Sequence, residues 1–189
     1  MAVRVAGAMA VRKVLQAAES ARWVERPAEA VARAVRRTIS GTRADRLLGG
    51  AWLGHPVHPL LVTVPIGACV SAPVLELCTG NRQAARWLIA LGLIAVPPAV
   101  VAGLADFAHL DARQRRVGAL HATANVVSTA FFGASLCCRP GARSAKVSMA
   151  LGTLTIAIGG ALGGHLSYAQ GAGVRRWQNT DESDSPVRR

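Results

Sequence analysis

Four long apolar segments dominate the chain after residue 50. They cover residues 59–75, 87–105, 117–138 and 147–169, and none of them contains Asp, Glu, Lys or Arg. Each segment has 17 to 23 residues. A helix needs about 20 apolar residues to cross a hydrocarbon core roughly 30 Å thick. The pattern therefore predicts four membrane-spanning helices.

The connections between these segments are short and carry turn or charge signals. They lie at residues 79–82, 111–116 and 139–141. Short connections make consecutive helices antiparallel neighbours. We therefore expect an all-α fold, an integral membrane four-helix bundle with up-down-up-down topology. In the last segment Gly159 with Gly163, and Gly160 with Gly164, form two small-xxx-small pairs that indicate close helix packing.

The first fifty residues have a different composition. Residues 1–15 lack the unbroken apolar core of a signal peptide. Residues 28–39 are expected to form a basic amphipathic helix that starts after Pro27 and ends before Gly41. This helix either lies on an anionic lipid surface or belongs to a loosely ordered, solvated basic arm. The expected domains are a basic amphipathic N-terminal arm (1–50), a four-helix transmembrane domain (51–175) and a disordered polar tail (176–189).

The overall composition agrees with a membrane protein. Hydrophobic residues make up 51% of the chain and charged residues only 17%, whereas soluble domains carry about 25% charged residues. The net charge of +12 would suit nucleic acid, but aromatic residues make up only 4% and no nucleic-acid-binding motif is present. We therefore expect the partner to be the lipid bilayer and not a nucleic acid.

The distribution of basic residues predicts an orientation. With four crossings, both termini and the second connection share one side, which holds 17 of the 22 Lys and Arg residues. Cytoplasmic segments carry an excess of Lys and Arg. We therefore expect a multi-pass protein of the cell membrane with both termini in the cytoplasm. Trp52, Trp87 and Trp177 lie at predicted helix ends, where interfacial aromatic residues gather.

The most distinctive motif is Gly54-His55-Pro56-Val57-His58-Pro59, directly before the first apolar segment. A residue before proline is disfavoured in a helix, and proline suits the first helical position. His55 and His58 are therefore expected on an extended approach to that helix. The expected topology places every histidine at a cytoplasmic helix end: His55, His58, His109, His121 and His165. Asp106 and Asn125 each lie about one turn from one of them.

Several stretches resemble one membrane-protein family. They are residues 54–59, 103–106, 118–121 with Asn125, and 163–166. In these stretches the chain resembles the family called domain of unknown function 2231, over roughly residues 50–174, and the His-Pro-x-His-Pro stretch is the most specific part. The resemblance implies a four-helix membrane domain, in some proteins joined to a Rieske-type iron–sulfur domain. It implies no established activity, His109 is not part of the pattern, and no Rieske-type Cys-x-His motif occurs here.

Neutral imidazoles from different helices are suitable ligands for a b-type haem or a metal ion. His121 and His165 are the expected principal pair, because each lies about a turn inside its apolar segment. His55 and His58 would form the rim or supply a further ligand. Asp106 and Asn125 would support the ligands, for example by a hydrogen bond that fixes an imidazole tautomer.

Three functional interpretations remain open. The first is a redox-associated membrane domain that holds haem or metal and works with a redox partner protein. The second is a non-catalytic scaffold whose His/Asp network is structural and whose basic arm docks lipid or a partner. The third is transport, which is disfavoured because no acidic residue lies at the predicted membrane midplane.

No hydrolytic, phosphate-binding or Cys-x-x-Cys signature occurs in the sequence, so no enzymatic activity is assigned. Cys78 and the Cys137-Cys138 pair lie at helix ends on the predicted outer face. An oxidising exterior would permit Cys78 to pair with either of them. The alternative is that these small side chains only pack. The sequence does not determine the oligomeric state.

Overall fold

The computed structural model describes residues 2–173, and every secondary-structure element within them is helical. The all-α prediction is therefore confirmed for this part of the chain. The elements are α1 (Ala2–Glu19), η1 (Arg22–Val24), α2 (Glu25–Ile39), α3 (Arg43–Leu48), α4 (His58–Leu61), α5 (Thr63–Thr79), α6 (Arg82–Phe107), α7 (Ala112–Cys137), α8 (Arg143–Gly164) and η2 (His165–Ala169). The expected tail over residues 176–189, with Trp177, lies outside the described residues.

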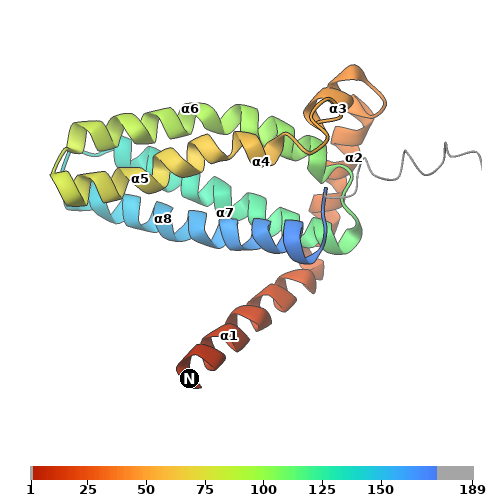
Figure 1. Ribbon diagram of the computed structural model, residues 1–189, viewed down its shortest axis with the longest axis horizontal. Helices are drawn as coiled ribbons and strands as arrows, with labels where there is room; N and C mark the ends of the chain where they lie inside the picture. The colour runs from red at the N-terminus through yellow and green to blue at the C-terminus, as the bar shows by residue number, and fades with distance from the viewer. Residues whose placement is uncertain (1, 174–189) are drawn as a thin grey trace, which may run out of the picture.

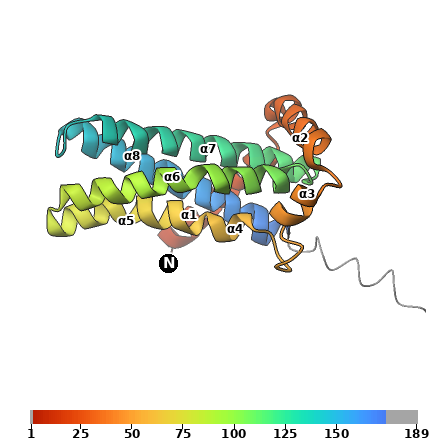
Figure 2. The ribbon, with the colours of Figure 1, turned by 90° about the horizontal axis from the view of Figure 1, so that it is seen from above.

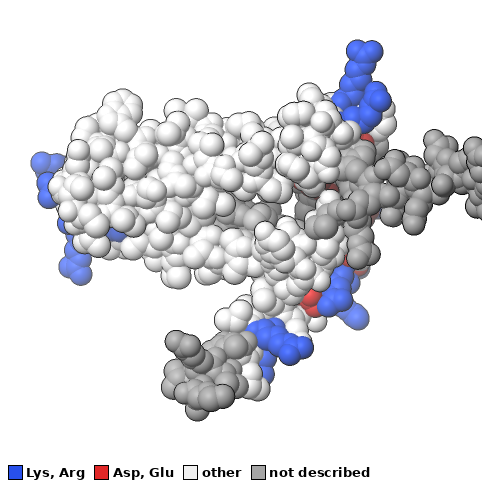
Figure 3. Space-filling model, viewed as in Figure 1, with Lys and Arg blue, Asp and Glu red and all other residues white. Residues whose placement is uncertain are grey.

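Helices α5 to α8 lie side by side, whereas α2 and α3 lie across one end of them (Figures 1 and 2). Lys, Arg, Asp and Glu gather at the two ends, and the surface between the ends is free of them in the view of Figure 3. Among the described residues three helical stretches are long and apolar enough to cross a membrane: His58–Thr79, Arg82–Phe107 and Arg143–Ala169. Helix α7 also has 26 residues, but it is not among the three. The chain is therefore a membrane protein with three spans identified by length and composition.

Local signals set the helix boundaries at the connections. Gly80 has a φ of +69°, a left-handed conformation that glycine adopts easily, and it ends α5. The Ala84 N–H donates to Asn81 Oδ1 at 3.0 Å, which starts α6. Asp111 starts α7 through a capping box with Gln114. These signals keep the connections short.

The start of the first apolar helix differs from the expectation. His58 is the first residue of α4, with Val57 as the N-cap, so it is helical rather than extended. The preference of a residue before proline is overridden because the His58 imidazole gains a hydrogen bond to a carbonyl of α6. The expected single helix over residues 59–75 is also divided, since Val62 separates α4 from α5. Farther along, Pro73 lies inside α5 without interrupting it.

Glycines let the two helices of each hairpin approach closely. A Cβ on Gly92 of α6 would lie 2.6 Å from Cys69 Sγ of α5. A Cβ on Gly152 of α8 would lie 2.9 Å from the Phe132 ring of α7. Ser128 Oγ of α7 also donates a hydrogen bond to the Gly152 carbonyl at 2.8 Å. The buried residues at this level form one core cluster: Cys69, Ala72, Ala85, Ile89, Phe132 and Met149.

The end of the body opposite α2 is closed by Arg86 of α6. Its guanidinium donates to the carbonyl of Leu136 at 2.7 Å and to that of Cys138 at 3.2 Å. These are carbonyls at the C-terminus of α7, where a positive charge is favourable. The four cysteines of the chain are free thiols, so the disulfide considered between Cys78 and Cys137 or Cys138 is not formed.

The N-terminal arm packs on the domain. Helix α2 begins at Glu25, earlier than expected, and buries Ala32. Arg36 of α2 donates to the Ala108 carbonyl beyond the end of α6 at 2.7 Å. Glu29 of α2 forms an ion pair with Arg115 of α7 at 2.6 Å. The arm is therefore not the loosely ordered segment that one of the two sequence interpretations described.

The close approach at Gly152 can be tested by adding one methyl group. Gly152→Ala should lower the thermal unfolding midpoint of the detergent-solubilised protein, because overpacking a core costs about 1–3 kcal/mol. Gly160→Ala is the matched control on the same helix, since a Cβ at Gly160 would meet nothing within 4 Å. The control should keep or slightly raise the midpoint, because alanine favours a helix more than glycine does. Equal midpoints for the two variants would contradict the packing described.

Candidate functional site

The five histidines fall into three groups. His58 and His121 face one another inside the body, with ring centres 6.4 Å apart and an angle of 88° between the rings. His109 and His165 each pair with a carboxylate of the N-terminal arm. His55 is exposed, and its Nδ1 lies 3.0 Å from the Pro56 carbonyl oxygen.

His58 is held against the backbone of α6. Its Nδ1 lies 2.8 Å from the Ala99 carbonyl oxygen. A helix carbonyl points toward the residue four positions on, so an imidazole that reaches Ala99 must lie against Gly103. A Cβ on Gly103 would lie 2.8 Å from His58 Cε1. Glycine at this position therefore leaves the space that the ring occupies.

His121 repeats this arrangement on the other hairpin. Its Nδ1 lies 2.8 Å from the Gly159 carbonyl oxygen of α8. A Cβ on Gly163, four residues on, would lie 2.8 Å from His121 Cε1. Asn125, one turn along α7, packs against Gly159 in the same way, since a Cβ there would lie 2.8 Å from Asn125 Oδ1. Both imidazoles are thus fixed by a backbone carbonyl and a glycine.

These contacts fix the tautomer of both rings. A carbonyl oxygen only accepts hydrogen bonds, so each Nδ1 carries the proton, and in a neutral ring the lone pair is on Nε2. Asn125 Nδ2 lies 3.2 Å from His121 Nε2 but also 3.4 Å from His121 Nδ1. An atom almost equidistant from the two ring nitrogens cannot lie along the Nε2 lone pair. The amide instead donates to the His121 carbonyl at 2.9 Å, which leaves the Nε2 lone pairs available to a ligand.

The distance between the rings agrees with two interpretations. Ring centres 6.4 Å apart suit a direct edge-to-face contact between two aromatic rings. They also suit two imidazoles on opposite sides of one metal, since metal–nitrogen bonds of about 2.0–2.1 Å place the ring centres about 6 Å apart. Within residues 2–173 no group of three or more His, Cys, Asp or Glu side chains could hold a metal ion. The described residues thus offer two imidazole ligands and no set of four protein ligands.

The two hairpins share one pattern at constant offsets in residue number. His121 follows His58 by 63 residues, and Gly163 follows Gly103 by 60 residues. The carbonyls that accept from the two histidines belong to residues 99 and 159, which also differ by 60. Both offsets therefore relate chemically equivalent positions, one for the first helix of each hairpin and one for the second.

The buried residues follow the same offsets. Each buried residue of α8 has a buried counterpart in α6, 60 positions earlier: Ala145 with Ala85, Met149 with Ile89, Gly152 with Gly92, Gly159 with Ala99, and Leu162 with Ala102. Three buried residues of α7 match buried residues of α5, 63 positions earlier: Ser128 with Pro65, Phe132 with Cys69, and Ser135 with Ala72. The two hairpins are therefore built on one packing pattern, and His58 and His121 occupy the same position in it.

Glu19 at the end of α1 binds the cytoplasmic-side histidine of the last helix. Its carboxylate lies 2.8 Å from His165 Nε2 and 2.6 Å from Arg113 Nη2, and it accepts from Gln170 Nε2 at 3.0 Å. The hydrogen bond from Arg113 lowers the pKa of Glu19 to about 2, although burial acts in the opposite direction. The expected principal pair was His121 with His165, whereas the structure joins His165 to Glu19 and His121 to His58.

Two carboxylates of the arm were absent from the site expected from the sequence. Glu19 holds His165, and Asp45 of α3 lies 3.0 Å from His109 Nε2. Neither shows a spacing signal, because both pairs join segments more than 60 residues apart. Asp106, expected to orient an imidazole, is half-buried in the last turn of α6, one turn beyond Gly103. The repeated hairpin did have a signal, the triplet Ala-Leu-Gly at 90–92 and again at 150–152.

The comparisons with known proteins bear on the part of the chain that contains both hairpins. Residues 54–176 match the model of a family described as "Predicted membrane protein (DUF2231)". No curated protein and no solved structure matches the chain. The matched residues include the His58 and His121 pair but not the arm that supplies Glu19 and Asp45.

The Glu19 contacts predict an acid-dependent loss of stability. A carboxylate whose pKa is lowered from 4.5 to about 2 stabilises the folded protein above pH 4.5. This contribution falls as the pH drops from 4.5 towards 2. Glu19→Gln should therefore lower the unfolding midpoint at neutral pH and remove that part of the acid dependence. Thermal unfolding of the detergent-solubilised protein over a pH series measures both.

Glu25→Gln is the control for the Glu19 variant. It makes the same change in charge at the same end of the molecule, but the Glu25 side chain is 43% exposed, against 12% for Glu19. Exposed ion pairs contribute about 0–1 kcal/mol, so Glu25→Gln should shift the midpoint less. A larger effect of Glu25→Gln would contradict the role given to Glu19.

Proposed function

We propose, for a chain that belongs to the family of predicted membrane proteins named DUF2231, that its membrane domain holds one b-type haem between His58 and His121. One observation carries this proposal: equivalent imidazoles of two hairpins face one another with each Nδ1 bound to a backbone carbonyl. A ligating histidine commonly donates its other ring N–H to such a group, which sets the tautomer and the ring orientation. The chemistry of the pair thus fits the group.

The number of ligands favours haem over a bare metal ion. Structural zinc sites take four protein ligands, and the described residues gather no third His, Cys, Asp or Glu with the pair. A porphyrin supplies the equatorial nitrogens itself, so two axial imidazoles complete the set. The hairpins also contact one another less extensively than the helices within each hairpin do. That looser interface is the plane in which a flat macrocycle would lie.

The residues around the pair have separate roles in this proposal. Haem iron with two imidazole ligands transfers one electron between its ferric and ferrous states. The Ala99 and Gly159 carbonyls hold the imidazoles in the tautomer that ligation needs. Gly103 and Gly163 give each ring its position against the neighbouring helix. The proposed function is therefore electron transfer within the membrane, near one face.

The proposal places α7 in the membrane as a fourth crossing. Helix α7 has the same length as α6, lies beside α8 and carries His121 at the level of His58. A polar residue within a membrane helix faces the protein interior, and His121 and Asn125 both face α8. Four crossings put both termini on one side, and the excess of Lys and Arg there favours the cytoplasm.

A scaffold without a cofactor is the second candidate. It is favoured by the contacts of the other histidines, since His109 with Asp45 and His165 with Glu19 attach the arm to the domain. In that case His58 and His121 would be hydrogen bonds between helices, and the ring contact would be direct. The two candidates differ in whether the purified protein absorbs light as a haem protein.

Spectra of histidine variants test the haem. The protein expressed with ample haem should show the Soret and α bands of a six-coordinate, bis-imidazole haem. His58→Ala and His121→Ala should each abolish the spectrum to a similar extent, because the two residues are equivalent ligands. His109→Ala is the control, since His109 pairs with Asp45 at the surface, and it should keep the spectrum. A colourless wild-type protein with its helical circular dichroism intact would leave the scaffold as the function.

Two adjacent glycines give a finer test of ring position. Gly163→Ala should shift or broaden the haem bands, because a Cβ there would lie 2.8 Å from His121 Cε1. Gly164→Ala is the control, since a Cβ at Gly164 would meet nothing within 4 Å. Identical spectra for the two variants would contradict the position proposed for the His121 ligand. Absorption and electron paramagnetic resonance spectra measure the difference.

Fusion reporters test the four crossings and the orientation. A reporter that is active only outside the cytoplasm should be silent at the C-terminus and active after Asn81 or Gly141. The reason is that both connections lie at the end of the body opposite α2, which the proposal places outside. An active C-terminal fusion would mean an odd number of crossings or the reverse orientation.

A further inference from the structure

Helix α2 has three distinct faces. Residues at intervals of three to four positions share one side of a helix. The first face, which includes Ala28 and Ala32, is buried against the domain. The second carries the arginines and glutamates of the helix. The third contains Trp23 at the preceding turn, Pro27 and Val31, at i, i+4 and i+8, and it is exposed. An amphipathic helix that only packs on a protein needs just the first two.

The third face is apolar but has no partner among the described residues. Trp23 is 77% exposed and Val31 is 45% exposed. Pro27, Ala30 and Ala34 on the same side are exposed as well. Apolar residues gathered on one exposed face indicate a contact that is not part of the folded chain itself. A tryptophan at such a position is typical of the boundary between headgroups and acyl chains.

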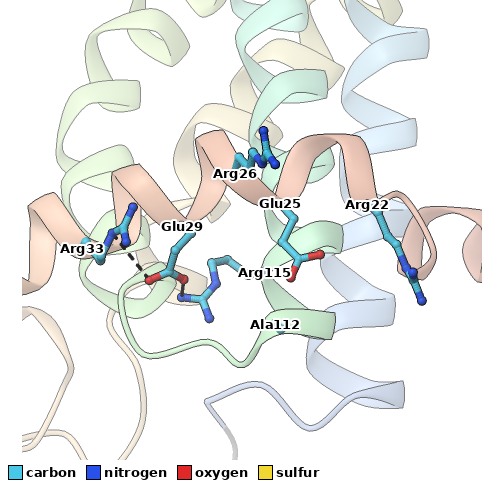
Figure 4. A pocket seen from close by; sticks show the side chains of 7 residues that line it. All are labelled: Arg22, Glu25, Arg26, Glu29, Arg33, Ala112 and Arg115. Atoms are coloured by element: carbon cyan, nitrogen blue, oxygen red, sulfur yellow. Dashed lines mark ion pairs between the residues drawn. The ribbon is translucent and has the colours of Figure 1, made fainter.

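The charged face next to it is short of carboxylates. Figure 4 shows the open cavity of about 570 Å³ beside α2, lined by arginines and glutamates. Glu29 is bound to Arg33, Arg36 and Arg115, and Glu25 is bound to Arg116. Arg22 and Arg26 form no ion pair with any described residue, and both are exposed. Both guanidinium groups are therefore available to an anion from outside the chain.

We propose that α2 lies in the headgroup layer of the membrane, with Trp23, Pro27 and Val31 on the acyl chains and with Arg22 and Arg26 on the phosphates of anionic phospholipids. The occupant follows from position. The helix lies across the end of the body, directly beside the charge-free surface that faces the bilayer (Figures 1 and 3). The apolar third face is continuous with that surface in chemistry, and the unpaired arginines have the sign that attracts anionic lipids.

Depth measurements on two neighbouring positions test the orientation of α2. Spin labels are placed at Val31→Cys or Arg33→Cys in the full chain, with the four native cysteines replaced, and the protein is reconstituted into lipid nanodiscs. Val31 and Arg33 lie on different faces, so the label at position 31 should be more accessible to oxygen than to a water-soluble nickel complex. The label at position 33 should show the reverse. Water accessibility at both positions, or spin–spin broadening from a second copy at position 31, would overturn the proposal.

Lipid composition tests the role of the two arginines. Nanodiscs of phosphatidylcholine mixed with phosphatidylglycerol should leave phosphatidylglycerol enriched on the wild-type protein after detergent extraction, as measured by native mass spectrometry. Arg22→Gln with Arg26→Gln should reduce this enrichment by about fivefold for each arginine. Arg139→Gln with Arg143→Gln removes the same charge at the opposite end and should leave it unchanged. Equal losses in both double variants would show general charge attraction and would overturn a site on α2. Both experiments are independent of whether haem is bound.

Discussion

The close approach of two helix backbones within each hairpin is the constraint on which the rest of the structure depends. Where a glycine lies four residues beyond a carbonyl, an aromatic or imidazole ring can lie flat on the helix and reach that carbonyl. Gly103 and Gly163 provide this space for His58 and His121. Any larger side chain at either position would push the ring away from its acceptor. The geometry of the histidine pair is therefore determined by residues that have no side chain of their own.

This constraint also explains how polar side chains are accommodated among apolar helices. A buried polar group without a hydrogen bond destabilises the fold, and in hydrocarbon no water can supply the missing partner. His58, His121 and Ser128 all bond to carbonyls of the neighbouring helix in their own hairpin. Each hairpin is thus satisfied internally. The interface between the hairpins does not have to provide hydrogen bonds, which leaves the outer nitrogens of the imidazoles for another purpose.

Much of the fold, but less of the candidate site, could be predicted from the sequence. Apolar length predicted the long helices, and Gly80, Asn81 and Asp111 indicated where they stop and start. The partner of His121 could not be predicted in the same way. Helix ends at one membrane face are equivalent in a topology argument, and His165 seemed as suitable as His58. The choice is made by Glu19, far away in sequence, which binds His165 at 2.8 Å.

The shared hairpin pattern has a consequence for assembly. Each histidine belongs to the first helix of its hairpin, and its acceptor belongs to the second. A hairpin can therefore enter the bilayer and orient its imidazole before the other hairpin has been synthesised. The last step of folding is then the docking of two prepared halves. Anything that binds both imidazoles binds the docked state and not the separated halves, so by mass action it would stabilise the assembled domain.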